Sequence, residues 1–285
     1  MKKSLILIVL LLIFGEITRI NAQTVSIPLN EIHYTASERI SYNLTKSDEI
    51  YDEYDLFGAF VVSHTFFNGK GKIVFEKPIT RIGLRAFEDV TSLLSITIPN
   101  SVLEIERWAF FCCKNLSRVT IGNSVFSIKA NAFYGCTSLK SITIPHSVTL
   151  IESEAFYGCE NLASVTIGDG VVSIGTAAFE NCSSLMSVTI GKCVTTISYA
   201  AFAGCSKLID IYCKSPMPPK VYYDDRYLYK EFADFNGSFP LNSMMNIYVP
   251  HTSLDLYRRP SAVKNEKCDV DNWTVYKRYV KPYEY

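Results

Sequence analysis

Residues Ile142–Ser164 read ITIPHSVTLIESEAFYGCENLAS, and this phrase recurs along the chain with a period of 23 residues. Self-similarity at a fixed period of this length is the signature of a stacked repeat architecture. The blocks begin at Ile73, Ile96, Val119, Ile142, Val165 and Val188, and a seventh start falls on Ile211. One column holds phenylalanine in all six blocks, always after alanine: Phe87, Phe110, Phe133, Phe156, Phe179 and Phe202. Copies in register predict a solenoid with a phenylalanine column in its core.

The spacing Leu139-x-x-Ile142-x-Ile144 is a leucine-rich-repeat phrase, and its last two residues alternate as in a strand with one buried face. We expect the AFYGC phrase, Ala155–Cys159, to form a helical turn that closes the coil. Glycine at Gly158 permits the return bend. The predicted fold is therefore an α/β solenoid of the leucine-rich repeat type. It has short parallel strands on one face, short helical turns on the other, and a cap at each end.

The pattern along the chain indicates an export signal, two caps and a repeat array. Lys2 and Lys3 precede an unbroken apolar run, Leu5–Phe14, which is too short to span a bilayer and is typical of a cleaved signal peptide. We expect cleavage between Ala22 and Gln23, and a secreted or cell-surface protein with no transmembrane segment in the mature chain. The predicted segments are a signal peptide at 1–22, an N-terminal cap at 23–72, six repeats at 73–210, a degenerate repeat and C-terminal cap with an aromatic insertion at 211–260, and a tail at 261–285.

Charge composition bears on the class of partner. Lys+Arg and Asp+Glu both number 28, so the formal net charge is zero. A nucleic-acid binder needs a net basic face that neutralises phosphates, so this balance argues against nucleic acid as a partner. A chain that is 48% hydrophobic and 20% charged is also unlike a disordered protein. Composition excludes partners better than it names a function.

The outward positions of the predicted strands form the candidate binding face. Most are serine or threonine, so the face should be smooth, nearly uncharged and open to a protein or glycan surface. A purely structural reading also exists, because threonine suits short strands and hydroxyls on neighbouring strands bond to each other. We expect the next positions, Pro99, Gly122, Pro145 and Gly168, to face outward too. The twelve face residues are Ser95, Thr97, Arg118, Thr120, Ser141, Thr143, Ser164, Thr166, Ser187, Thr189, Asp210 and Tyr212.

Cysteine occupies one column of the repeat, at Cys113, Cys136, Cys159, Cys182 and Cys205. Paired strands lie ~4.8 Å apart, which exceeds the ~3.5–4.5 Å between Cβ atoms that suits a disulfide. We therefore expect five buried free thiols that pack as small apolar groups. Whether Cys112 and Cys268 form a pair stays open.

Catalytic and metal-binding patterns do not emerge from the sequence. The histidines are scattered without an H-E-x-x-H pattern, and the acidic cluster from Asp48 to Asp55 lacks the glycine and ligand spacing of a calcium loop. The chain also lacks a P-loop, a G-x-S-x-G elbow and a dinucleotide fingerprint. We expect no enzymatic activity, no metal and no cofactor.

The repeat is interrupted before its last strand, since Ile211 and Ile247 lie 36 residues apart. Exposed aromatic side chains in this insertion would form a recognition loop, because tyrosine is a favoured interface anchor. Packed aromatic side chains would instead cover the open end of the solenoid, and we favour this second reading. The aromatic residues are Tyr222, Tyr223, Tyr227, Tyr229, Phe232 and Phe235.

Four stretches carry a resemblance to a known family. They are the repeat phrase L-x-S-I-T-I-P-x-S-V-x-x-I-x-x-x-A-F-x-G-C, FGAFVVSHTFFNGKGKIVF at Phe57–Phe75, CKSPMPP at Cys213–Pro219 and IYVPHTSLDLY at Ile247–Tyr257. Over roughly residues 55–260 the chain resembles the BspA-like leucine-rich repeat proteins. The resemblance implies a protein secreted by, or displayed on, gut and oral bacteria or some mucosal parasites. Some members are implicated in adhesion to host matrix proteins, other bacteria or epithelial cells, and the family offers no catalytic residues to carry over.

Two functions are compatible with these observations. The first is an exported, non-catalytic surface adhesin or interaction module that recognises a protein or glycan partner through the sheet face, such as host matrix or another cell surface. The alternative is a structural or assembly component of the cell envelope with no host ligand. The sequence names neither the ligand nor the means of anchorage.

Overall fold

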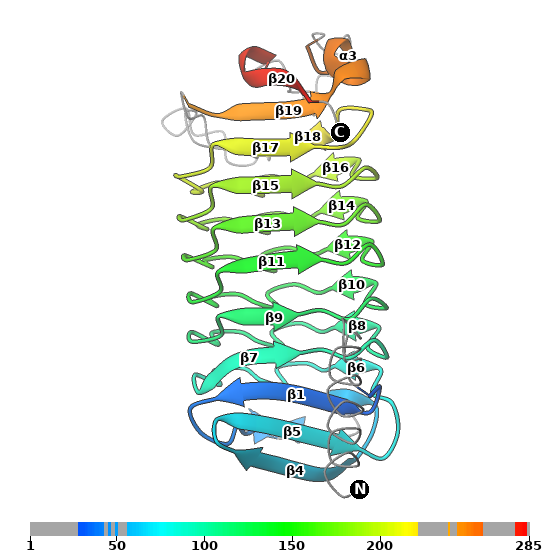
Figure 1. The fold of residues 1–285 in the computed structure, drawn as a ribbon, viewed down its shortest axis with the longest axis vertical. Coiled ribbons are helices and arrows are strands. Elements are labelled where there is room, and N and C mark those ends of the chain that lie inside the picture. Colours follow the sequence, from blue (N-terminus) through cyan, green and yellow to red (C-terminus); the bar gives the residue numbers. More distant parts are fainter. Residues whose placement is uncertain are drawn as a thin grey trace, which may run out of the picture.

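A computed structural model describes residues 28–42, 45–46, 49–50, 56–221, 239, 244–258 and 277–283, so the predicted signal segment lies outside the described residues. The described residues form an elongated stack of coils (Figure 1). Each coil contributes a longer strand to one side of the stack and a two-residue strand to another. Exposed and buried residues alternate along β13 (Ser164–Ile167), as the sequence pattern predicts. The predicted solenoid of parallel strands is confirmed.

Strands of successive coils pair in register, one repeat apart. Ser141 pairs with Ser164, and Ser164 pairs with Ser187. A slip by one residue would turn the buried isoleucines to solvent, so the core holds this register. Besides β13, the longer strands are β7 (Leu93–Thr97), β9 (Arg118–Thr120), β11 (Ser141–Ile144), β15 (Ser187–Ile190), β17 (Asp210–Cys213) and β19 (Asn246–Pro250). The short strands form a seven-stranded parallel sheet of β6 (Arg81–Ile82), β8 (Glu104–Ile105), β10 (Ser127–Ile128), β12 (Leu150–Ile151), β14 (Ser173–Ile174), β16 (Thr196–Ile197) and β18 (Lys220–Val221).

An antiparallel sheet closes the N-terminal end of the stack. Strands β4 (Val61–Phe67) and β5 (Lys70–Phe75) form a hairpin whose turn, Asn68-Gly69, has positive φ at both residues, as a two-residue hairpin turn favours. Strand β1 (Glu31–Ala36) lies between β5 and β7 and is antiparallel to both. The first sequence block therefore starts, at Ile73, in the hairpin and not in the parallel ladder. Behind them, β2 (Thr45–Lys46) and β3 (Glu49–Ile50) form a separate two-stranded sheet.

The phenylalanine column runs through the core of the stack. All six side chains are 0% exposed, and successive ring centroids lie 4.9–5.3 Å apart with nearly parallel planes. Phe57 packs against Phe87 at one end, and Phe239 stacks on Phe202 at 5.0 Å at the other. Each end of the column is thus covered by a phenylalanine that lies outside the six blocks.

The phrase Ala155–Cys159 forms a turn, so the prediction of helical turns on the second face is wrong. Glu154 and Gly158 have φ of 57° and 66°, and two left-handed residues four positions apart break the right-handed run that a helix needs. The Phe156 amide donates to the Ala178 carbonyl of the next coil at 2.7 Å. The Gly158 amide likewise donates to the next coil, whereas the Tyr157 and Cys159 amides donate within the turn, so only alternate amides bond locally. Short helices in the described part of the chain include η2 (His251–Ser253), α3 (Leu254–Arg258) and η4 (Lys277–Tyr279), which lie at the C-terminal end.

The C-terminal end continues the sheet beyond the insertion. Asp210 of β17 pairs with Asn246 of β19, so the strand ladder resumes in register after the longer gap. Strand β20 (Val280–Tyr283) then pairs in parallel with β19 (Figure 1). Tyr257 of α3 is fully buried and its hydroxyl donates to the Ser215 carbonyl at 2.8 Å. The six aromatic residues of the insertion lie outside the described residues. Among the helices that are described, none has the length and apolar character to cross a bilayer.

Candidate functional site

The twelve predicted residues lie on the outer side of the longer strands, where they alternate with core residues. Those of β9, β11 and β13 are exposed, and those of β7, β15 and β17 are half-buried. Parallel pairing places equivalent side chains side by side, as in Thr143 opposite Thr166. The structure thus brings all twelve onto one surface, which we call the sheet face. Its threonine row consists of Thr97, Thr120, Thr143, Thr166 and Thr189.

Hydroxyls on the sheet face differ in their hydrogen bonding from those at the corners of the coils, where the chain turns between strands. At the corners, Ser117 Oγ donates to the Leu94 carbonyl and Thr149 Oγ1 donates to the Phe126 carbonyl, both at 3.1 Å. Corner hydroxyls are thus bonded to the backbone of the preceding coil. On β9, β11, β13 and β15, seven hydroxyls of the sheet face form no hydrogen bond with any described residue, so their bonding capacity is turned to solvent. They belong to Thr120, Ser141, Thr143, Ser164, Thr166, Ser187 and Thr189.

A bond between hydroxyls of neighbouring strands does occur at the N-terminal edge of this face. Thr35 Oγ1 of β1 and Ser95 Oγ of β7 lie 2.6 Å apart. Strand β1 also places His33 opposite Thr97. The sheet face therefore continues onto the N-terminal cap, and the structural reading of the hydroxyls holds at this edge.

The proline and glycine positions that follow the strands are buried and do not extend the face outward. A Cβ built on Gly168 would lie 2.6 Å from the carbonyl carbon and oxygen of Pro145, and one on Gly122 would lie 2.4 Å from the Pro99 oxygen. Glycine is needed here because the backbones of successive coils approach closely. The expectation of an outward Pro–Gly column is corrected by this packing.

A hollow of about 530 Å³ lies over β9, β11 and β13. Threonines of the sheet face line it, together with two cations. One cation, Arg118, comes from β9, and the other, Lys214, comes from the residue after β17. Sequence reasoning missed Lys214, because nothing in the repeat pattern indicates that it reaches this part of the sheet.

One side of the hollow is formed by polar side chains that bond from coil to coil. His146 Nδ1 accepts a hydrogen bond from the Asp169 amide at 3.1 Å, and Asp169 Oδ1 accepts one from the Lys192 amide at 3.3 Å. Asn100 Oδ1 accepts the Asn123 amide in the same way at 2.8 Å. A neutral His146 whose Nδ1 is an acceptor carries its proton on Nε2, where it can donate to a ligand.

Two further strands extend the face at its C-terminal end. The Tyr212 ring stacks on Tyr248 of β19 at 4.8 Å, and Tyr283 of β20 meets Tyr212 edge-on at 5.6 Å. Asn246 Nδ2 donates to Asp210 Oδ1 at 3.0 Å. Burial, assisted by the Asp210 carboxylate, raises the pKa of Tyr212, which keeps its phenol protonated at neutral pH.

The sequence pattern indicates the residues that β19 adds to the face more clearly than those that β20 adds. The alternation of Ile247, Tyr248 and Val249 repeats that of β17, so Tyr248 could have been assigned to the face from the pattern alone. Lys281 and Tyr283 lie on a strand of only four residues that contains Pro282, which weakens the strand signal.

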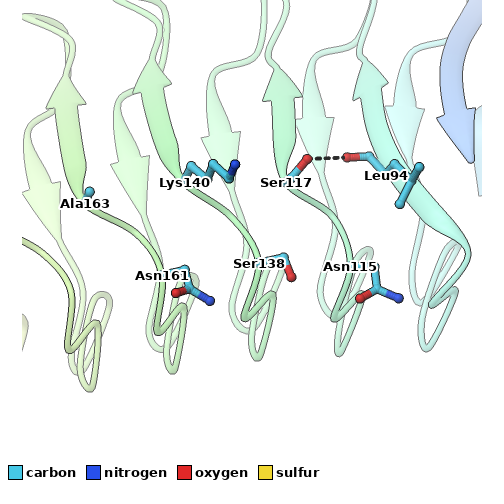
Figure 2. Close-up of a pocket in the computed structure, with 7 residues that line it drawn as sticks. All are labelled: Leu94, Asn115, Ser117, Ser138, Lys140, Asn161 and Ala163. Atoms are coloured by element: carbon cyan, nitrogen blue, oxygen red, sulfur yellow. Dashed lines mark hydrogen bonds between the residues drawn. The ribbon is translucent and has the colours of Figure 1, made fainter.

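A second hollow, of about 640 Å³, lies on the flank where the longer strands begin (Figure 2). Ser117 points toward Leu94 there and bonds to its carbonyl. Asn115 Nδ2 donates to the Thr91 carbonyl at 2.9 Å. Two repeats further on, Asn161 Nδ2 donates to the Thr137 carbonyl at 2.8 Å. The polar groups of this flank already join neighbouring coils, so their role is structural.

The five column thiols are buried and free, as predicted. Each donates to a phenylalanine carbonyl of the preceding coil, as Cys136 Sγ does to Phe110 at 3.2 Å. Burial raises the pKa of every thiol in the column. Burial also raises the pKa of Cys213 to about 11. Cys268 lies outside the described residues, so its pairing with Cys112 stays open.

We expect the column thiols to react very slowly with a thiol reagent at about pH 8 in the folded protein, because only the thiolate is nucleophilic. All five should react after denaturation without reductant. Cys193 is exposed and should react quickly in the folded protein, so Cys193→Ser is the control that removes the fast phase. Fewer than five reactive thiols in the denatured protein would show that the column contains disulfides.

The histidines of the N-terminal cap have local structural partners. His33 Nε2 lies 2.7 Å from a Glu31 carboxylate oxygen, and His64 Nε2 lies 2.7 Å from the Tyr34 hydroxyl. Burial lowers the pKa of His64. In the part of the chain that the structure describes, no three His, Cys, Asp or Glu side chains gather as a metal site. The chemistry that the sheet face offers is hydrogen bonding and charge.

Comparison with known proteins agrees with this architecture. A family model described as BspA type Leucine rich repeat region, with six copies, matches residues 62–152 and 126–223. Solved structures to which the chain is similar include a leucine-rich repeat protein of T. pallidum, at 27% identity over 62% of this chain and 81% of that one, with a TM-score of 0.48. A second is a leucine-rich repeat protein from Bacteroides ovatus ATCC 8483, at 26% identity over 62% of this chain and 54% of that one, with a TM-score of 0.40. A third is a leucine rich cell surface protein from Faecalibacterium prausnitzii A2-165, at 25% identity over 67% of this chain and 62% of that one, with a TM-score of 0.41. No curated protein matches the chain.

The residues matched by the family model are mainly those that form the stacked coils. The matched residues span more than half of the chain and contain all the longer strands from β7 to β17. Leucine-rich repeats generally serve as protein-binding scaffolds without enzymatic activity. The chain belongs to the BspA-type leucine-rich repeat family.

Proposed function

We propose that the chain is an exported, non-catalytic surface adhesin or interaction module that recognises a protein or glycan partner through the sheet face. The observation that carries this proposal is the contrast between two sets of hydroxyls. Corner hydroxyls bond to the backbone of the preceding coil, whereas the seven on β9, β11, β13 and β15 keep their donors and acceptors for a partner. Export rests on the first 22 residues, whose pattern is that of a cleaved signal peptide.

Binding through the sheet face should cost little conformational entropy. Nine of its twelve side chains are serine or threonine, which lose less rotamer freedom on binding than lysine or glutamate. Hydrogen-bonded strands hold the backbone beneath them in one geometry. Rungs spaced by ~4.8 Å make a face of roughly 29 Å across six strands, which suits a partner surface of standard size.

Introducing three carboxylates on the threonine row should abolish recognition. We expect Thr120→Glu, Thr143→Glu and Thr166→Glu together to weaken partner binding at least tenfold, because the larger charged side chains hold the partner away and lose the hydroxyl bonds. The measurement is a binding screen of the purified protein against immobilised matrix proteins, mucins and glycans.

A matched control places the same charges elsewhere on the same three coils. Ala130, Ser153 and Thr176 occupy one repeat position away from the sheet face, and their glutamate variants should bind normally. Binding that survives the threonine-row changes would move the site to the caps. If neither protein binds any host component, and the native protein copurifies with envelope complexes, the structural role is correct and the proposal fails.

A further inference from the structure

The hollow over β9, β11 and β13 carries a local excess of positive charge. Arg118 and Lys214 line it, and neither forms an ion pair with any described residue. The Asp169 carboxylate, which also lines it, is already bonded to the Lys192 amide, with Lys192 Nζ at 3.9 Å. The lining carboxylate is therefore compensated by a neighbour, while no described residue compensates either lining cation.

Strong hydrogen-bond donors also line this hollow. The Arg118 guanidinium and Lys214 ammonium are donors only. His146 presents Nε2–H when neutral, because its Nδ1 accepts the Asp169 amide. Hydroxyls of the threonine row can donate as well as accept. The complementary ligand group is negatively charged and rich in acceptor oxygens.

The lining further indicates how such a ligand is recognised. Among the described residues that line the hollow, none is phenylalanine, tyrosine or tryptophan. A protein partner generally needs buried aromatic or aliphatic anchors. The aliphatic residues of this lining are already buried in the stack, whereas its hydroxyls offer hydrogen bonds repeated once per coil on three coils. A polyhydroxylated chain with acidic units matches that repetition better than a peptide does.

We infer that the hollow binds a carboxylate-bearing polysaccharide, whose acid groups pair with Arg118 and with Lys214 and whose hydroxyls bond to the threonine row. This inference rests on the proposed function and names the class of ligand for the same face.

The test uses the purified full chain and three polymers: hyaluronan as the carboxylated polysaccharide, dextran as a neutral one, and polyglutamate as an acidic peptide. We expect saturable binding to hyaluronan in preference to the other two. Binding should weaken as salt rises from about 0.05 to 0.5 M, because screening acts on exposed charges. Arg118→Gln with Lys214→Gln should lower the affinity for hyaluronan about tenfold to a hundredfold, and the glutamate versions should lower it further.

Matched controls separate a local effect from net charge. Lys140 and Lys207 are exposed cations outside the hollow, and Lys140→Gln with Lys207→Gln should leave hyaluronan binding unchanged. Melting temperatures of all variants check folding, and the glutamine pair keeps the test valid should charge reversal disturb the coil.

Several outcomes would overturn the inference. These are equal binding of dextran, tighter binding of polyglutamate, no binding of hyaluronan, or equal losses in the control pair. If the glutamate changes in the threonine row abolish binding to another partner while hyaluronan fails to bind, this inference falls and the proposed function stands. If no partner responds to the threonine row, both fall.

Discussion

Phe156→Ala is expected to lower the free energy of unfolding by about 3–5 kcal/mol. The ring is fully buried and stacks between Phe133 and Phe179 at 5.1 and 5.0 Å. Hydrogen bonds tie each coil to its neighbours, as from the Phe156 amide to the Ala178 carbonyl, so the stack cannot collapse to fill the cavity. Equilibrium denaturation followed by circular dichroism measures this change.

The same substitution at an exposed phenylalanine provides the control. Phe126 is 44% exposed at a corner of the coil, and Phe126→Ala should change the free energy of unfolding by less than about 1 kcal/mol. Similar losses of unfolding free energy at the two positions would contradict the conclusion that the phenylalanine column stabilises the core. An unchanged melting temperature for Phe156→Ala would contradict it as well.

Gly168→Ala is expected to destabilise the protein by about 3 kcal/mol, through overpacking between coils. The new methyl group would lie 2.6 Å from the Pro145 backbone, which is hydrogen-bonded in the stack and cannot move as a side chain can. Relief requires the two coils to separate, which weakens the pairing of β11 with β13. Thermal unfolding of the variant measures the effect.

Gly158→Ala separates steric overlap from backbone strain. A Cβ at Gly158 meets no heavy atom within 4 Å, but its φ of 66° is left-handed. This variant should therefore lose only about 1–2 kcal/mol, the cost of a non-glycine residue in that conformation. A larger loss at Gly158 than at Gly168 would show that strain, and not close approach of the coils, limits the glycine positions.

Much of the solenoid and of its candidate face could be derived from the sequence. A period of 23 residues places equivalent residues one above another, so a single buried column, such as that of Phe156, implies all its copies. Alternation at Ile142 and Ile144 then determines which side of each strand is outward, because side chains of a strand alternate between its faces. These are local periodic signals, and they located every member of the threonine row.

Tertiary structure alone decided the rest. The AFYGC phrase lacks a helix because alternate amides, those of Phe156 and Gly158, find partners in the next coil, and no local pattern shows where those partners lie. Likewise, Gly168 is buried because Pro145 of the preceding coil approaches it, and β1 joins the stack antiparallel from 60 residues away, as the Thr35–Ser95 contact shows. Lys214 reaches the hollow only because the coils stack and bring the end of β17 toward β13. The sequence by itself determined what repeats within a coil, whereas contacts between coils and at the ends depend on residues distant in the chain, which only the folded stack brings together.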